Sequence, residues 1–190
     1  MVKRKQYLRR GLLLLAPVVC MGLVSAEAAI AAPNKAAQCD RLVTAANKMA
    51  PIAERFLQES QNFEKAANAA GDNGDLSAFQ KAASKSAGIF NQLVTQLDRV
   101  TTEIRGVSLQ DQSLINFKNE YVTIATSINS AFKDTIGALT TISKAQNSPA
   151  GLEVIQKASE SLDRVANRMD GVAQKEDKLV DNFNRYCGAQ

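Results

Sequence analysis

Apolar residues recur at alternating three- and four-residue steps in four long segments of this 190-residue chain. This spacing is typical of helices with one buried face and of coiled coils, and no segment shows the two-residue alternation of a half-buried strand. The sequence therefore predicts an all-α protein with four long helices. The four apolar stripes run through residues 42–67, 76–104, 114–142 and 155–186.

Turn and capping residues separate these segments at 71–75, 106–108 and 147–149. Asp75 is placed to cap the second helix, and Ser108 with Asp111 predicts a capping box for the third. Pro149 is expected at the first helical position of the fourth, where its missing N–H is harmless. Because all three connections are short, we expect an antiparallel up-down-up-down four-helix bundle with both termini at one end.

Pro51 lies inside the first helical segment. Proline removes one backbone hydrogen bond, so it predicts either a kink or a split into a short amino-terminal piece and a main rod. The apolar stripes are also rich in Ala, Ser and Thr, which let helices approach closely. We therefore expect a dense core without a large central cavity, and a pocket at an open end stays an alternative.

The first 31 residues have the organisation of an export signal. Five basic residues, the last of them Arg10, precede an apolar run of 14 residues from Gly11 to Val24, and candidate cleavage sites follow at Ala28 and Ala31. A bilayer-spanning helix needs about 20 apolar residues, so cleavage is favoured over an uncleaved membrane anchor. We expect residues 1–31 to be a signal peptide, residues 32–190 to form a single domain, and the location to be periplasmic or secreted.

Removal of the signal makes the chain electrically neutral. The signal carries five of the 23 Lys and Arg and one of the 19 Asp and Glu, which leaves 18 of each. The basic character of the whole sequence thus gives no support for binding to nucleic acid or to anionic membranes. Basic and acidic residues alternate along the helices, as is usual for solvated helix faces.

Two cysteines remain after the signal, Cys39 and Cys187, one near each end of the domain. An even pair in an oxidising compartment predicts a disulfide, and the bundle topology brings both cysteines to the same end. Two free thiols and an intermolecular bond are the alternatives.

The chain contains no histidine and no tryptophan. Catalysis by Ser-His-Asp or Cys-His groups is therefore excluded, as are a c-type haem motif and the Glu-x-x-His pairs of di-metal bundles. Asp72, Asn73 and Asp75 cluster in the first turn but do not match a calcium-binding loop, and no glycine-rich phosphate loop occurs. We expect no enzyme activity, no cofactor and no metal site.

Glu176 is the one carboxylate on the apolar stripe of the fourth helix. Counting heights in an antiparallel bundle places it level with Tyr121 of the third helix. Because an unpartnered buried carboxylate is costly, we expect the Tyr121 hydroxyl or a neighbouring Lys to satisfy it. The pair is a candidate polar contact for a ligand, and the alternatives are a polar layer that fixes helix register or a side chain that reaches the edge.

These observations favour an exported, non-enzymatic bundle that acts through protein interaction as an accessory or structural module. The alternative is a small-molecule or lipid carrier that uses the bundle interior, with Glu176, Tyr121 and phenylalanines as its pocket. Four apolar residues beside the main stripe distinguish the two hypotheses, because an exposed patch implies a partner and an interior void implies a ligand. These residues are Ile89, Val94, Ile115 and Ile136. The pattern does not predict an oligomeric state.

Overall fold

The computed structural model describes residues 34–188, so the predicted export signal lies outside the described residues. Regular structure in the described part of the chain is helical throughout, which confirms the all-α prediction. The elements are α1 (Lys35–Ala46), a 3₁₀ turn (Asn47–Met49), α2 (Ala50–Asp72), α3 (Leu76–Gly106), α4 (Gln112–Lys144) and α5 (Pro149–Cys187).

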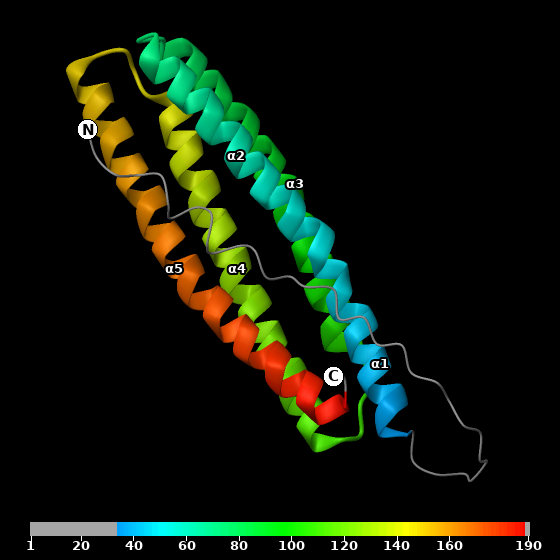
Figure 1. Ribbon diagram of the computed structural model, residues 1–190. Coiled ribbons are helices and arrows are strands. Elements are labelled where there is room, and N and C mark those ends of the chain that lie inside the picture. Colours follow the sequence, from blue (N-terminus) through cyan, green and yellow to red (C-terminus); the bar gives the residue numbers. More distant parts are fainter. Residues whose placement is uncertain (1–33, 189–190) are drawn as a thin grey trace.

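The long helices pack in chain order, α2 on α3, α3 on α4 and α4 on α5, as an antiparallel four-helix bundle (Figure 1). The short helix α1 precedes α2 and contacts α3, α4 and α5 at the end of the bundle where α5 finishes. The core is centred on the α3–α4 hairpin, because the largest fully buried side chains come from these two helices. They are Phe90, Leu93, Leu97, Ile104, Leu114, Leu139 and Ile142.

Pro51 splits the first rod, which is one of the two outcomes that its position predicts. Since Pro51 has no N–H to donate to the Asn47 carbonyl, the chain tightens into a 3₁₀ turn in which the Ala50 amide bonds to Asn47 instead. This exchange leaves the Ala46 carbonyl free to accept a hydrogen bond from the Tyr121 hydroxyl of α4 at 3.4 Å.

The predicted breaks between helices are confirmed, and two of the predicted caps hold. The Asp75 carboxylate accepts a hydrogen bond from the Ala78 amide at 2.9 Å, and the Ser148 hydroxyl accepts one from the Gly151 amide at 3.1 Å, with Pro149 at the first helical position. Each cap satisfies an amide that the helix itself leaves without a partner.

The capping box predicted for Ser108 and Asp111 is wrong. Asp111 is itself the residue that caps α4, and its carboxylate accepts from the Leu114 amide at 3.0 Å. The cause is a tertiary contact: the side-chain oxygen of Gln38 accepts hydrogen bonds from the Gln110 and Asp111 amides at 2.6 and 3.1 Å. These bonds occupy the loop amides, and α4 begins only at Gln112.

Cys39 and Cys187 form a disulfide with their Cα atoms 6.1 Å apart, as predicted. Two further contacts hold the same end of the bundle closed. The Tyr186 hydroxyl donates to the Asp111 carboxylate at 2.7 Å, and the Lys35 ammonium lies 3.8 Å above the Tyr186 ring. This disulfide and these contacts form the terminal clasp of the molecule.

Candidate functional site

A groove of about 400 Å³ lies between α2 and α5. These two described helices do not pack against each other, although they are the first and last long helices of the bundle. The groove is lined by side chains from all four long helices: Phe56, Ser60, Phe63, Glu64, Ala67, Asn68, Phe79, Phe90, Thr135, Leu139, Ile142, Ser159, Leu162, Asp163, Val165, Ala166, Met169 and Asp170.

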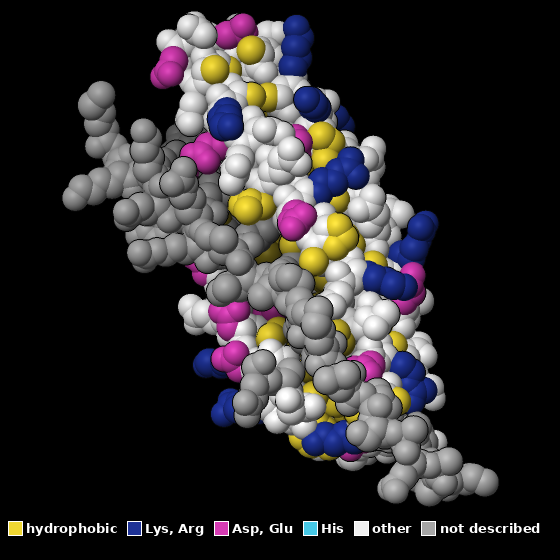
Figure 2. All heavy atoms as spheres, turned by 45° about the vertical axis from the view of Figure 1, so that its right-hand side comes forward, with side chains coloured by type: hydrophobic (Ala, Val, Ile, Leu, Met, Phe, Trp, Pro, Cys, Tyr) yellow, Lys and Arg dark blue, Asp and Glu magenta, His cyan; other side chains and the backbone are white. Residues whose placement is uncertain are grey.

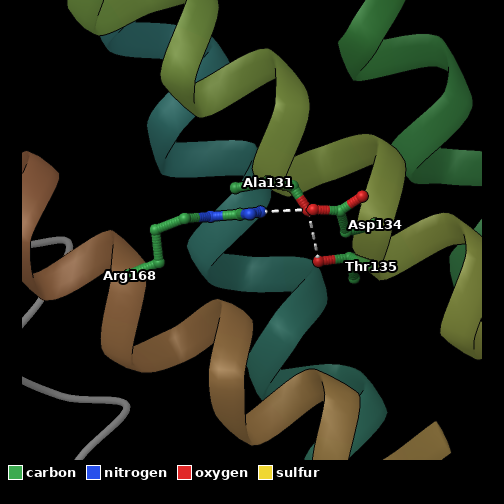
Figure 3. Close-up of polar contacts among 4 residues, drawn as sticks. All are labelled: Ala131, Asp134, Thr135 and Arg168. Atoms are coloured by element: carbon green, nitrogen blue, oxygen red, sulfur yellow. Dashed lines mark hydrogen bonds and ion pairs between the residues drawn. The ribbon is translucent and has the colours of Figure 1, made fainter.

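The floor of the groove is apolar and rigidly packed. Phe56 stacks on Phe132 with ring centroids 4.3 Å apart and lies 5.1 Å from Phe90. The one hydroxyl on the floor belongs to Thr135, which donates to the Ala131 carbonyl at 2.9 Å within α4 (Figure 3). Because that donor is already used, the floor offers a ligand apolar surface rather than hydrogen bonds.

The α2 wall continues the apolar stripe of its helix without a facing partner. Phe56 is buried, whereas Ser60, Phe63 and Ala67 are only half-buried and line the groove. Their spacing of four, three and four residues is that of a coiled-coil seam. In a closed bundle this seam packs against the last helix. Here Phe63 stacks on Phe79 of α3, with ring centroids 6.0 Å apart, and α5 does not cover the rest of this face.

The α5 wall has the same character. Val165 and Met169 are buried, and Leu162 is half-buried. The small residues Ser159 and Ala166 lie seven positions apart along the outer edge of this wall, which we call its lip. Ser60 and Ala67 repeat this spacing on α2. Small side chains at both lips leave room for another backbone to approach closely.

Carboxylates border the groove on both sides. Glu64 stands on the α2 lip and Asp163 and Asp170 on the α5 lip, and the described residues that line the groove include no Lys or Arg. None of the three makes an ion pair or a hydrogen bond with a described residue. Arg168 of α5 reaches Asp134 of α4 at 2.5 Å instead (Figure 3), so this nearby guanidinium does not neutralise the lip.

The four residues expected to distinguish partner from ligand do not form an exposed patch, and none of them lines the α2–α5 groove. Val94 is buried, and Ile89, Ile115 and Ile136 are half-buried and do not line the groove. Large exposed apolar side chains among the described residues are Leu152 (56 % exposed) and Val154 (41 %). Figure 2 shows basic and acidic side chains interspersed over the described part of the face that it draws.

Glu176 and Tyr121 are brought to one level of the bundle but do not form the predicted hydrogen bond. The Tyr121 hydroxyl donates to the Ala46 carbonyl, and no hydrogen bond joins Glu176 to another residue in the described range. Burial, together with the charge of Asp177, raises the pKa of Glu176 to about 7. Burial and then the Glu176 charge raise the pKa of Tyr121 above its ordinary value. A ligand contact at this pair stays a prediction.

The described residues contain no group of three or more His, Cys, Asp and Glu side chains that is placed to hold a metal ion. In the same part of the chain, no helix has the length and apolarity needed to cross a bilayer.

The fold and the groove together define a class of protein: a disulfide-closed antiparallel four-helix bundle with an open apolar groove between its first and last long helices. No family model, curated protein or solved structure matches this chain.

The expectation of a dense core holds for α3 and α4 but misses the groove. The small residues of the α2 and α5 stripes indicate close packing equally well whether the neighbour belongs to the same chain or to another molecule. The signal that could have located the groove is the weak apolar content of 57–72, where Phe63 is the one large apolar residue after Leu57.

Proposed function

We propose that this protein is an exported, non-enzymatic binding module whose α2–α5 groove receives the apolar face of a helix from a partner protein. The observation that carries this proposal is the uncovered seam of α2, in which Ser60, Phe63 and Ala67 have core spacing but only partial burial. A helical face left uncovered by its own bundle is the kind of surface on which amphipathic helices dock.

The dimensions of the groove suit a helix of about three turns. Its lining spans residues 56–68 on α2 and 159–170 on α5. At a rise of 1.5 Å per residue each wall is about 17 Å long. A docked helix of that length presents three or four apolar anchors at i, i+3 or i+4, and i+7, which match the spacing of both walls. The small residues on the lips permit the helix to sit deeply.

Export is supported by two independent features, the signal-like first 31 residues and the disulfide between Cys39 and Cys187. Disulfides persist in oxidising compartments and are rare in the cytosol. Intact-mass measurement of the protein from the extracytoplasmic fraction tests this part of the proposal. We expect a chain that begins after Ala28 or Ala31; a mass that includes Met1 would contradict cleavage and favour the anchor.

Peptide binding tests the groove. The probe is a labelled 14-residue amphipathic helix with a Leu stripe bordered by Gln, and the readout is fluorescence anisotropy. We expect Ala67→Trp to abolish binding because the indole fills the groove, whereas Ala66→Trp, one position away on the exposed face of α2, leaves binding unchanged. Failure of the peptide to bind, or equal binding by both variants, would overturn a helix-docking function.

A small apolar ligand is the second candidate occupant, and the volume of about 400 Å³ favours it because this value lies in the usual range for small-molecule sites. The solvatochromic dye Nile red tests it directly. If no peptide binds, and dye fluorescence rises with the wild-type protein but not with Ala67→Trp, the occupant of the groove is a small ligand and not a helix.

A further inference from the structure

We infer that the α2–α5 groove selects a partner helix whose apolar face is bordered by Lys or Arg side chains. This inference rests on the proposed function, since it specifies the charge of the helix that the groove receives. Three carboxylates lie around the apolar floor of this groove.

The carboxylates face the groove from both sides. Asp163 and Asp170 lie seven residues apart on α5, two turns along the same edge and therefore about 10 Å from one another. Glu64 stands on the opposite lip of α2. A helix lying between the lips places the residues that flank its apolar face next to these carboxylates. The charge of those flanking residues therefore affects the binding affinity.

Within residues 34–188, no side chain compensates this negative charge. Lys65 and Arg164, the nearest basic residues in sequence, do not line the groove, and Arg168 is paired with Asp134. The described structure gives Glu64, Asp163 and Asp170 no ionic partner. Attraction between charges is stronger beside an apolar, low-dielectric floor than in open water. A basic border on the partner helix is thus complementary, and an acidic border is repelled on both lips.

The experiment compares three labelled 14-residue peptides that share a Leu stripe and differ only in the border, which is Lys, Gln or Glu. We expect the wild-type protein at low salt to bind the Lys-bordered peptide about tenfold more tightly than the Gln-bordered one, as three partly exposed ion pairs predict. The Glu-bordered peptide should bind more weakly than the Gln-bordered one. Raising the salt concentration to about 1 M should bring the three affinities together.

Two triple variants separate the lips from general electrostatics. Glu64→Gln with Asp163→Asn and Asp170→Asn should reduce the preference for the Lys-bordered peptide to about twofold or less. The matched control is Glu54→Gln with Glu120→Gln and Asp181→Asn, which changes the net charge equally at exposed positions outside the groove and should keep the preference. Circular dichroism confirms that both variants fold.

The outcomes distinguish this inference from the proposed function. If all three peptides bind equally and Ala67→Trp blocks them, the groove docks helices but the charge preference is refuted. If both triple variants lose the preference alike, general attraction explains it and the lips are not the cause. If no peptide binds, the docking function fails, and the charge preference fails with it. Self-association that Ala67→Trp abolishes would make a second copy of the chain the occupant and overturn the inference.

Discussion

Glu176 is a carboxylate whose environment favours the protonated form. It is only 8 % exposed on α5, and burial raises its pKa to about 7 from the ordinary value of 4.5. Between these two values the unfolded chain releases the proton and the folded chain retains it. The residue therefore contributes a stability that is present at low pH and is lost as the pH rises from about 4.5 to about 7.

Replacing Glu176 by Gln should remove this dependence, because Gln resembles the protonated side chain. We expect the variant to be about 3 kcal/mol more stable than wild type at pH 8 and close to wild type at pH 4.5, following about 1.4 kcal/mol per unit of pKa shift. Urea unfolding of both proteins across this range is the measurement. A constant difference between the two curves at every pH would show that Glu176 does not titrate in this interval.

Tyr186 and Asp111 make the polar contact of the terminal clasp. The hydrogen bond from the Tyr186 hydroxyl is the main cause that holds the pKa of Asp111 below its ordinary value of 3.8. A carboxylate whose pKa is lowered in the folded state stabilises the fold at pH values above its ordinary pKa. This stability is lost as the pH falls through the lowered pKa of the folded state.

Tyr186→Phe removes the donor and keeps the ring beneath Lys35. We expect the pKa of Asp111 to rise toward its ordinary value, as followed by carboxyl carbon chemical shifts in an NMR titration. The stability difference between wild type and variant should shrink as the pH falls below about 3.8. An unchanged Asp111 titration would mean that the Leu114 amide, rather than Tyr186, sets the pKa.

At the scale of single elements, the start of α5 depends on a glycine. Gly151 lies in the first turn of α5, and a Cβ placed there would approach the Gln146 carbonyl oxygen to 1.8 Å. The neighbour is backbone of the α4–α5 loop, so it does not have the freedom of a flexible side chain to move aside. Gly171 lies further along the same helix and has open space around it.

These two glycines make a matched pair of variants. Gly151→Ala should lower the free energy of unfolding by about 1–3 kcal/mol because the loop must shift. Gly171→Ala should raise it by about 0.5–1 kcal/mol because alanine is the better helix former. Thermal or urea unfolding followed by circular dichroism measures both. Equal effects of the same sign would show that the close approach to Gln146 does not constrain α5.

The local sequence predicted where helices begin and end better than it predicted which elements contact one another. The helical stripes, the breaks and the caps at Asp75 and Ser148 depend on residues close in sequence, and the structure confirms them. The Ser108 cap failed because Gln38, more than 70 residues away, takes the loop amides. The periodicity does not reveal the groove, because the stripe of α2 has the same period whether or not α5 covers it. The one local sign of the groove is the weak apolar content of 57–72.

At the scale of the whole molecule, the disulfide closes a loop of 148 residues. Such a cross-link acts mainly by restricting the unfolded chain, so Cys187→Ser should lower stability by about 2–4 kcal/mol and leave the helical content unchanged. Denaturation with and without a reductant measures the loss. The double variant with Cys39→Ser should be no less stable than the single one, and a further loss would show that the two thiols stabilise the fold separately.

The terminal clasp also determines how the molecule bears mechanical load. With Cys39 and Cys187 joined, a pull on the two ends of the chain passes through one covalent bond, and the stretch of chain between the cysteines carries none of the tension. Reduction of that bond places the bundle in series with the force and releases about 500 Å of extensible chain at full stretch. The redox state of one bond therefore decides whether the protein behaves under tension as a short, inextensible link or as a long, yielding one.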